Sequence, residues 1–176
     1  MTMEPFVESE MTFGPYEDGH CFRVEVSETY RTIQDKVQMA EFLLLQTKEN
    51  SPPFVWIVEA KQSSPRPETQ PNFSDFIGEI RDKLANALSV GVASILKRHL
   101  SANDELPDLF KTLNLAATGF RLVLIINGLQ KAWLQPLQDA LRSALHATAQ
   151  TWALGPNAVV VINHEDAKRF GLISAP

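Results

Sequence analysis

Hydrophobic and polar residues alternate in short runs through the first part of the chain, a pattern typical of β-strands. The pattern predicts strands over residues 11–15, 21–26, 40–46 and 54–61. Ser27 is a suitable N-cap for a short helix that ends near Ile33. The polar segment 47–53 is short enough to connect antiparallel neighbours, so we expect an antiparallel meander in this region.

Apolar residues then recur every three or four positions over residues 73–99, after a proline-rich segment that resembles a surface loop. This periodicity predicts a long amphipathic helix. Gly91 lies in the middle of the helix, where glycine costs about 1 kcal/mol relative to alanine. Such a residue indicates that the helix packs closely against a sheet at this point.

Continuous apolar runs over residues 120–127 and 158–162 predict strands that are covered on both faces. A helix over residues 134–149 separates them, and a short polar helix follows the second strand. Because helical crossovers between buried strands imply parallel pairing, this half should extend the sheet with parallel strands. The predicted fold class is α/β, with a mixed β-sheet flanked by helices in a single domain over residues 1–176.

The composition, with 44% hydrophobic and 21% charged residues, is that of a folded globular protein and excludes a disordered or fibrous chain. Cys21 is the only cysteine, so no intrachain disulfide can form and a reducing compartment is expected. Residues 1–10 lack the basic and apolar segments of a secretory signal, and no apolar run is long enough to span a bilayer. We therefore expect a cytoplasmic protein with no membrane partner.

The net charge of −5 is unevenly distributed, because acidic residues dominate residues 1–60 whereas residues 61–100 carry a small excess of Lys and Arg. This distribution is unlike that of a protein that coats nucleic acid through charge alone. It fits a carboxylate-rich site beside a modestly basic surface, or a random fluctuation of surface charge. Gly-rich phosphate loops, a GxSxG elbow and a Cys/His nucleophile pair are absent from the sequence.

Three ionisable residues can converge on two of the predicted strands. Glu59 and Lys61 share one face because strand side chains alternate. In an antiparallel hairpin, Glu41 can lie opposite either of them on that same face. Carboxylate oxygens suit Mg²⁺ or Mn²⁺, which activates water for attack on a phosphate, and a lysine can stabilise the developing charge. The alternative interpretation is a cross-strand salt bridge on a solvated sheet face.

The spacing of Glu59 and Lys61 is not specific, since Asp166-Ala167-Lys168 has the same spacing. The second tripeptide follows His164 in a predicted helix, with no strand leading into it. The first ends a strongly hydrophobic strand and has an acid-bearing strand before it. The two predicted strands around Glu59 and Lys61, and not the tripeptide alone, therefore indicate a site.

In this context, residues 20–127 resemble the PD-(D/E)XK nuclease superfamily. That family places an acid on one strand and a (D/E)xK triplet on the next, followed by a helix and a further strand. The resemblance rests on AEFLLL (40–45), WIVEAK (56–61), the helix after Asn72 and RLVLIIN (121–127). It implies a restriction-endonuclease-like core and a metal-dependent phosphodiesterase.

The resemblance also implies roles for individual residues. Glu41 and Glu59 would bind Mg²⁺ (or Mn²⁺) and Lys61 would assist the attacking water. Glu41 stands where the family usually has Asp, and its extra methylene shifts the position of the carboxylate. Glu28, in the short helix after Ser27, is a candidate for a further metal ligand, and lesser candidates are Glu8, Glu10 and Glu25.

Other residues have a structural and a functional interpretation. His164-Glu165-Asp166 has metal-ligating types but also the pattern of a polar helix start, and His20 beside Cys21 lacks the second pair that zinc requires. Tryptophans are expected in the core or covering the sheet, rather than as base-stacking platforms, at Trp56, Trp133 and Trp152. Five cations are expected on the solvated side of a helix, and the alternative is that they contact a phosphate backbone. They are Arg66, Arg81, Lys83, Lys97 and Arg98.

Two functions from different classes follow. The first is a Mg²⁺-dependent nuclease that hydrolyses a phosphodiester of DNA or RNA, with Glu41, Glu59 and Lys61 as its catalytic residues and nucleic acid as its partner. The second is a catalytically inactive nuclease-like module that serves as a protein-interaction subunit, and the acidic surface and small size favour it. A small acidic nuclease is expected to need a protein partner or a homo-oligomer to grip nucleic acid.

Overall fold

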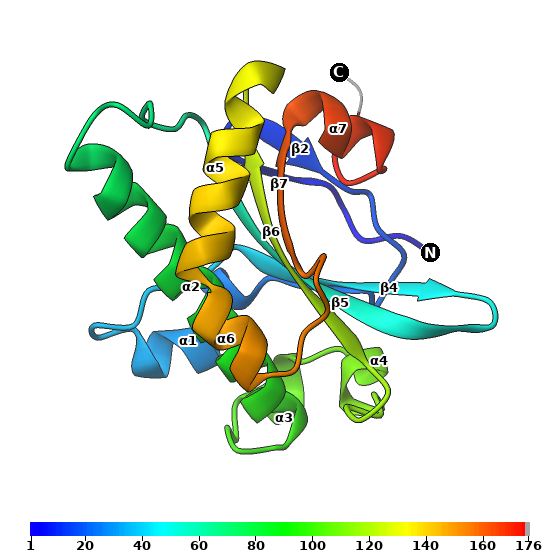
Figure 1. The fold of residues 1–176 in the computed structure, drawn as a ribbon. Helices are drawn as coiled ribbons and strands as arrows, with labels where there is room; N and C mark the ends of the chain where they lie inside the picture. Colours follow the sequence, from blue (N-terminus) through cyan, green and yellow to red (C-terminus); the bar gives the residue numbers. More distant parts are fainter. Residues whose placement is uncertain (175–176) are drawn as a thin grey trace.

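The computed structural model describes residues 1–174. Its strands form a five-stranded sheet in the order β3-β4-β5-β6-β7 and a separate two-stranded sheet of β1 and β2 (Figure 1). The strands are β1 (Phe6–Glu8), β2 (Met11–Phe13), β3 (Cys21–Phe22), β4 (Phe42–Lys48), β5 (Ser51–Lys61), β6 (Gly119–Ile126) and β7 (Val159–Asn163).

The larger sheet is mixed. Strands β3, β4 and β5 pair antiparallel, whereas β6 is parallel to β5 and β7 is parallel to β6. The parallel pairs are joined through crossovers that contain α2 (Asn72–Ile95) and α5 (Lys131–Ala144). The predicted α/β class with a mixed sheet flanked by helices is therefore confirmed.

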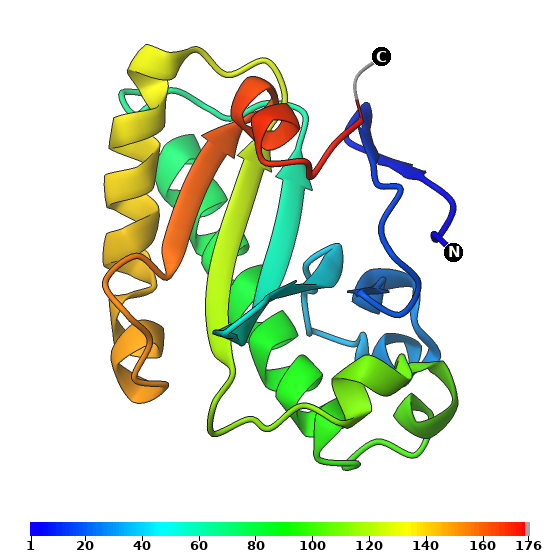
Figure 2. The same cartoon turned by 90° about the vertical axis from the view of Figure 1, so that its right-hand side faces the viewer.

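The long helices α2 and α5 lie together on one face of the five-stranded sheet (Figure 2). Between them and the sheet lies the larger core, which includes Leu43, Ile57 and Leu124 from the strands and Leu84 from α2. This arrangement follows from the sequence, because α2 has an apolar stripe at helical spacing and successive side chains of each strand point to opposite faces of the sheet. Odd-numbered residues of β5 therefore face the helices.

Gly91 allows α2 to lie close to β4. A Cβ atom at position 91 would lie 2.6 Å from Cδ2 of Leu43, which is buried in the same core. This distance is too short for two carbon atoms, so any larger side chain would force the Leu43 side chain to shift within the core. The close packing predicted from this glycine is confirmed.

The other face of the sheet is covered only in part. The hairpin of β1 and β2 lies on this side (Figure 2), where Phe6 and Phe13 pack against Phe42 of β4. The even-numbered residues Val58 and Ala60 of β5 are buried beneath this second core. Trp56, two residues before Val58 on the same face of β5, is only partly buried. One end of this face is thus left open.

Short helices connect the larger elements, and Ser27 caps the N-terminus of α1 as predicted, because its side chain accepts a hydrogen bond from the Tyr30 amide. They are η1 (Val24–Val26), α1 (Glu28–Ile33), α3 (Ala102–Glu105), α4 (Asp108–Lys111), α6 (His146–Thr151) and α7 (His164–Arg169). Within residues 1–174, no helix combines the length and apolar character needed to cross a membrane.

Some predicted boundaries are wrong. The strand expected over residues 21–26 ends at Phe22, and η1 follows it. The expected loop 47–53 is mostly strand, because β4 and β5 continue into a long hairpin. The helix expected over residues 134–149 begins at Lys131 and divides at Leu145 into α5 and α6. Alternating polarity alone cannot distinguish a two-residue strand followed by a tight turn from a longer strand.

Candidate metal centre

Glu59 lies near the end of β5 and points toward α2. Its side chain is fully buried, which is unusual for a carboxylate. Lys83 of α2 donates a hydrogen bond of 3.2 Å to Oε1 of Glu59, and Nζ of Lys61 lies 3.5 Å from the same oxygen. Among the described residues, Oε2 of Glu59 has no hydrogen-bond partner. Half of this buried carboxylate is therefore unused by the protein.

Lys61 connects Glu59 to a second acid on α2. Its Nζ donates a hydrogen bond of 2.7 Å to Oε1 of Glu79. Lys83 follows Glu79 by one helical turn and lies 3.9 Å from it. Two glutamates and two lysines therefore form one network of ion pairs. This network of Glu59, Glu79, Lys61 and Lys83 is called here the Glu59 network.

The Glu59 network balances burial against paired charge. Burial raises the pKa of Glu59, Lys83 and Lys61 oppose that rise, and the resulting pKa is about 7. Burial would lower the pKa of Lys61, but the hydrogen bond to Glu79 and the charge of Glu59 raise it instead. Lys61 therefore stays protonated and acts as a hydrogen-bond donor, not as a base.

Glu41 lies immediately before β4, beside the end of β5. Its amide donates a hydrogen bond of 3.0 Å to the carbonyl of Val58, the residue that is paired with Phe42, so the regular antiparallel pairing ends at Phe42. The charge of Glu59 contributes to the raised pKa of Glu41, so the two carboxylates lie near each other, as predicted. The residue is only 9% exposed, and its Oε2 has no hydrogen-bond partner among residues 1–174.

Two acids from the N-terminal region complete the surroundings of Glu41. Glu8 ends β1 and Glu25 belongs to η1. One carboxylate oxygen from each of Glu8, Glu25 and Glu41 lies within 4.8 Å of the others. The amide of Glu25 also donates to the carbonyl of Glu41 at 3.4 Å, which holds η1 against the start of β4. These three residues are called here the carboxylate triad.

The carboxylate triad has little positive charge to balance it. Arg23 forms an ion pair of 2.6 Å with Glu8, and in the described part of the chain it is the only cation paired with the triad. Burial, a hydrogen bond with Glu25 and the charges of Glu59, Glu25 and Glu8 together raise the pKa of Glu41 to about 9. The triad and the Glu59 network therefore interact electrostatically.

The triad fits a hard divalent cation. Mg²⁺ takes oxygen ligands at about 2.1 Å in octahedral geometry, which separates ligand oxygens by about 3–4 Å. The triad oxygens, within 4.8 Å of one another, need only a small contraction to meet this spacing. The unpartnered oxygens of Glu41 and Glu59 supply further acceptor capacity. Glu8, Glu25 and Glu41 would be the ligands, and Glu59 lies outside this group of three.

Of the predicted site residues, the structure thus brings Glu41, Glu59 and Lys61 into one region, but it does not bring Glu28 there. Glu28 begins α1, its side chain is 61% exposed, and its carboxylate pairs with Arg31. Glu25, a lesser candidate, lies in the triad instead. The reason is that η1, and not α1, packs against the start of β4.

Sequence reasoning missed the role of Lys83. It is only 15% exposed and pairs with Glu59, although it was expected on the solvated side of the helix. Two features of the sequence could have indicated a partly buried lysine here: Lys83 lies one helical turn after Glu79, and it immediately precedes the core residue Leu84. Arg81, by contrast, is exposed and pairs with its neighbour Asp82, as expected of a solvated face.

The histidine alternatives have structural explanations. Nδ1 of His164 accepts a hydrogen bond of 3.1 Å from the amide of Gly128, at the start of the polar helix α7. Asp166, of the second acid-x-Lys tripeptide, pairs with Arg169 within the same helix at 2.9 Å. Neither residue belongs to the carboxylate triad.

A comparison of the chain with protein-family models, curated proteins and solved structures finds no match.

Proposed function

We propose that this chain is a Mg²⁺- or Mn²⁺-dependent phosphodiesterase that hydrolyses nucleic acid on a core of the PD-(D/E)XK, or restriction-endonuclease-like, type. The observation that carries the proposal is the carboxylate triad, with an unpartnered oxygen on the almost completely buried Glu41, whose pKa also reflects the charge of Glu59. The order α1, β4, β5, α2 and β6 supports the proposed core.

The geometry suggests a division of work among these residues. Glu41, Glu25 and Glu8 would hold the cation, and Glu59 would position Lys61 beside it. A bound divalent cation supplies a water of lowered pKa and offsets charge on the phosphate. Lys61, held protonated by Glu79 and Glu59, would donate to the attacking water or to a phosphate oxygen. Hydrolysis forms one P–O bond from water and breaks the P–O bond to the leaving sugar oxygen, which takes up a proton.

The test is metal-dependent cleavage of single- and double-stranded DNA and RNA by the purified chain. Glu59→Gln and Lys61→Ala should each reduce cleavage by roughly 100-fold or more, because both act at the reacting phosphate. The matched controls are Asp166→Asn and Lys168→Ala, which change the same residue types at the same spacing in α7. Full activity of the Glu59 and Lys61 variants would refute the assignment of the site.

A second candidate function is the noncatalytic nuclease-like module that binds a partner protein. The charge balance of the Glu59 network favours it, since two lysines already pair with Glu59 and Glu79 without any metal. The two candidates differ in the response to Mg²⁺ and Mn²⁺. The module requires no binding of either ion, and calorimetry on the purified chain distinguishes it from the phosphodiesterase.

A further inference from the structure

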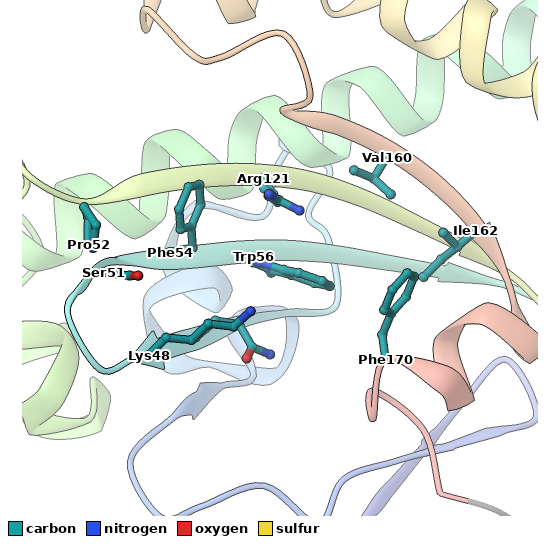
Figure 3. Close-up of a pocket in the computed structure, with 10 residues that line it drawn as sticks. Lys48, Ser51, Pro52, Phe54, Trp56, Arg121, Val160, Ile162 and Phe170 are labelled. Atoms are coloured by element: carbon teal, nitrogen blue, oxygen red, sulfur yellow. The ribbon is translucent and has the colours of Figure 1, made fainter.

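A hollow lies on the open face of the sheet, on the opposite side from Glu59. It has a volume of about 490 Å³ and extends over β4 to β7 and the end of α7 (Figure 3). This volume is in the range of about 300–1,000 Å³ that is usual for small-molecule sites. The hairpin of β1 and β2 covers the other end of this face and leaves the hollow accessible.

Aromatic side chains provide much of the lining. Phe54 and Trp56 lie one after the other along β5, and Phe170 stands at the opposite end of the hollow (Figure 3). Phe170 is 57% exposed, and Trp56 is only partly buried. Exposed aromatic rings that face a concave surface are typical of sites for planar ligands.

Positive charge accompanies these rings. Cζ of Arg121 lies 5.1 Å from the ring centre of Phe54 and 5.7 Å from that of Trp56, and Lys48 reaches the same hollow from β4. No acidic residue lines the hollow, and within residues 1–174 neither cation has a carboxylate in ion-pair contact. Since the whole chain carries a net charge of −5, this is a local reversal of sign.

We propose that this aromatic pocket binds a nucleotide unit. The base stacks on Trp56, the guanidinium of Arg121 lies against the stacked rings, and Lys48 binds the phosphate. The amide of Gln46 and the hydroxyl of Ser51 line the same pocket and can hydrogen-bond to the base or the sugar. A free nucleotide and a nucleotide within a single strand share this chemistry.

The inference does not rest on the proposed hydrolytic function. The pocket residues Phe54 and Trp56 lie on one face of β5, whereas Glu59 and Lys61 lie on the other face and bond to Lys83 and Glu79 of α2. Binding is therefore measured in the presence of EDTA, which removes metal-dependent hydrolysis from the experiment. A chain that binds nucleotides without cutting nucleic acid, or the reverse, separates the two proposals.

The experiment is calorimetry at low salt with the full chain and four probes: adenosine 5′-monophosphate, adenosine, inorganic phosphate and a short oligoadenylate. We expect saturable binding of the monophosphate that is tighter than that of adenosine or phosphate. Tighter binding of the oligoadenylate identifies a single strand as the source, and equal binding identifies the free nucleotide. If neither adenosine 5′-monophosphate nor the oligoadenylate binds saturably, the proposal is overturned.

Variants test the assigned residues. Trp56→Ala and Arg121→Gln should each weaken binding by roughly 10- to 100-fold, the usual effect of losing a stacking platform. Trp56→Phe keeps an aromatic face and should retain most of the affinity, so it tests the pocket even where the alanine variant fails to fold. Trp152→Ala, at a partly exposed tryptophan outside the pocket, is the control. Equal binding by wild type and both pocket variants overturns the proposal.

Discussion

The carboxylate triad and the Glu59 network lie side by side but handle buried negative charge in different ways. In the network, Lys61 and Lys83 contact Glu59 at 3.5 Å and 3.2 Å. In the triad, Arg23 pairs with Glu8, and Glu41 keeps an unpartnered oxygen in the described structure. One group of acids is balanced by the protein, and the other is not.

This difference indicates where an external cation would act. A buried carboxylate without a cation raises its pKa and binds a proton, as the pKa of about 9 for Glu41 reflects. A divalent ion would replace that proton and relieve the repulsion among Glu8, Glu25 and Glu41. Glu59 has a pKa of about 7, so its ionised form depends less on a bound cation.

The largest effect is expected from Lys83→Ala, which removes charge balance from the Glu59 network. The buried carboxylate of Glu59 would keep only Lys61, and we expect the free energy of unfolding to fall by about 3 kcal/mol at pH 8. Urea denaturation measures this change. The control is Arg81→Ala on the same helix, where an exposed pair should cost at most about 0.5 kcal/mol. Equal losses in the two variants would mean that Lys83 is not the partner of Glu59.

Mg²⁺ should act on the triad through Glu41. At a concentration of 100 times its dissociation constant, the ion should raise the free energy of unfolding by about 2.7 kcal/mol. Glu41→Gln should abolish this increase, and without metal it should stabilise the protein at pH 8, because glutamine is neutral without the proton uptake that Glu41 requires on folding well above its ordinary pKa of 4.5. Thermal unfolding with EDTA and with Mg²⁺ measures both changes. A variant that still responds to Mg²⁺ would place the ion elsewhere.

The pH dependence of the metal-free protein gives a third test. The pKa of Glu41 rises from its ordinary value of 4.5 to about 9 in the folded chain, and that of Glu59 rises from 4.5 to about 7. The folded state therefore binds more protons than the unfolded state above pH 4.5. Stability from these groups is complete below that pH and is lost as the pH rises through the two folded values.

We expect the free energy of unfolding in EDTA to decrease between pH 5 and 8 by about 1.4 kcal/mol per pH unit at most for each group. Urea denaturation across this range measures the slope. Glu41→Gln should reduce the slope, particularly above pH 7, where folded Glu59 is losing its proton and Glu41 still holds its own. A free energy that rises with pH over this range would contradict the proton-bound state of the triad.

The smallest effect is expected from Arg23→Gln. Arg23 pairs with Glu8 and lies 4.4 Å from the ring centre of Phe6, but it is partly exposed. Its loss should lower the stability of the metal-free chain by at most about 1 kcal/mol. The same variant should bind Mg²⁺ more tightly, since one repelling positive charge is gone. Calorimetry measures the affinity, and a weaker affinity would indicate that Arg23 organises the triad.

Several features of the site could be predicted because they depend on local rules. Alternation along β5 sets Glu59 and Lys61 on one face, and hairpin pairing allows Glu41 to lie opposite Glu59. The contribution of Lys83 could not be predicted from amphipathicity, because its position at the edge of the apolar stripe allows either a solvated or a buried amine. Glu8 could be only a lesser candidate, because it ends a three-residue strand far from Glu41 in sequence.

The order of strands and helices, the face shared by Glu59 and Lys61 and the close approach at Gly91 follow from the pattern of residues, because periodicity and glycine act over a few neighbouring positions. The choice of Glu8 and Glu25 over Glu28 as neighbours of Glu41 depends on how the hairpin of β1 and β2 and the turn η1 pack against the sheet. The partial cover of the opposite face, which exposes Trp56, depends on the same packing. Such contacts join distant parts of the chain, and no local pattern specifies them.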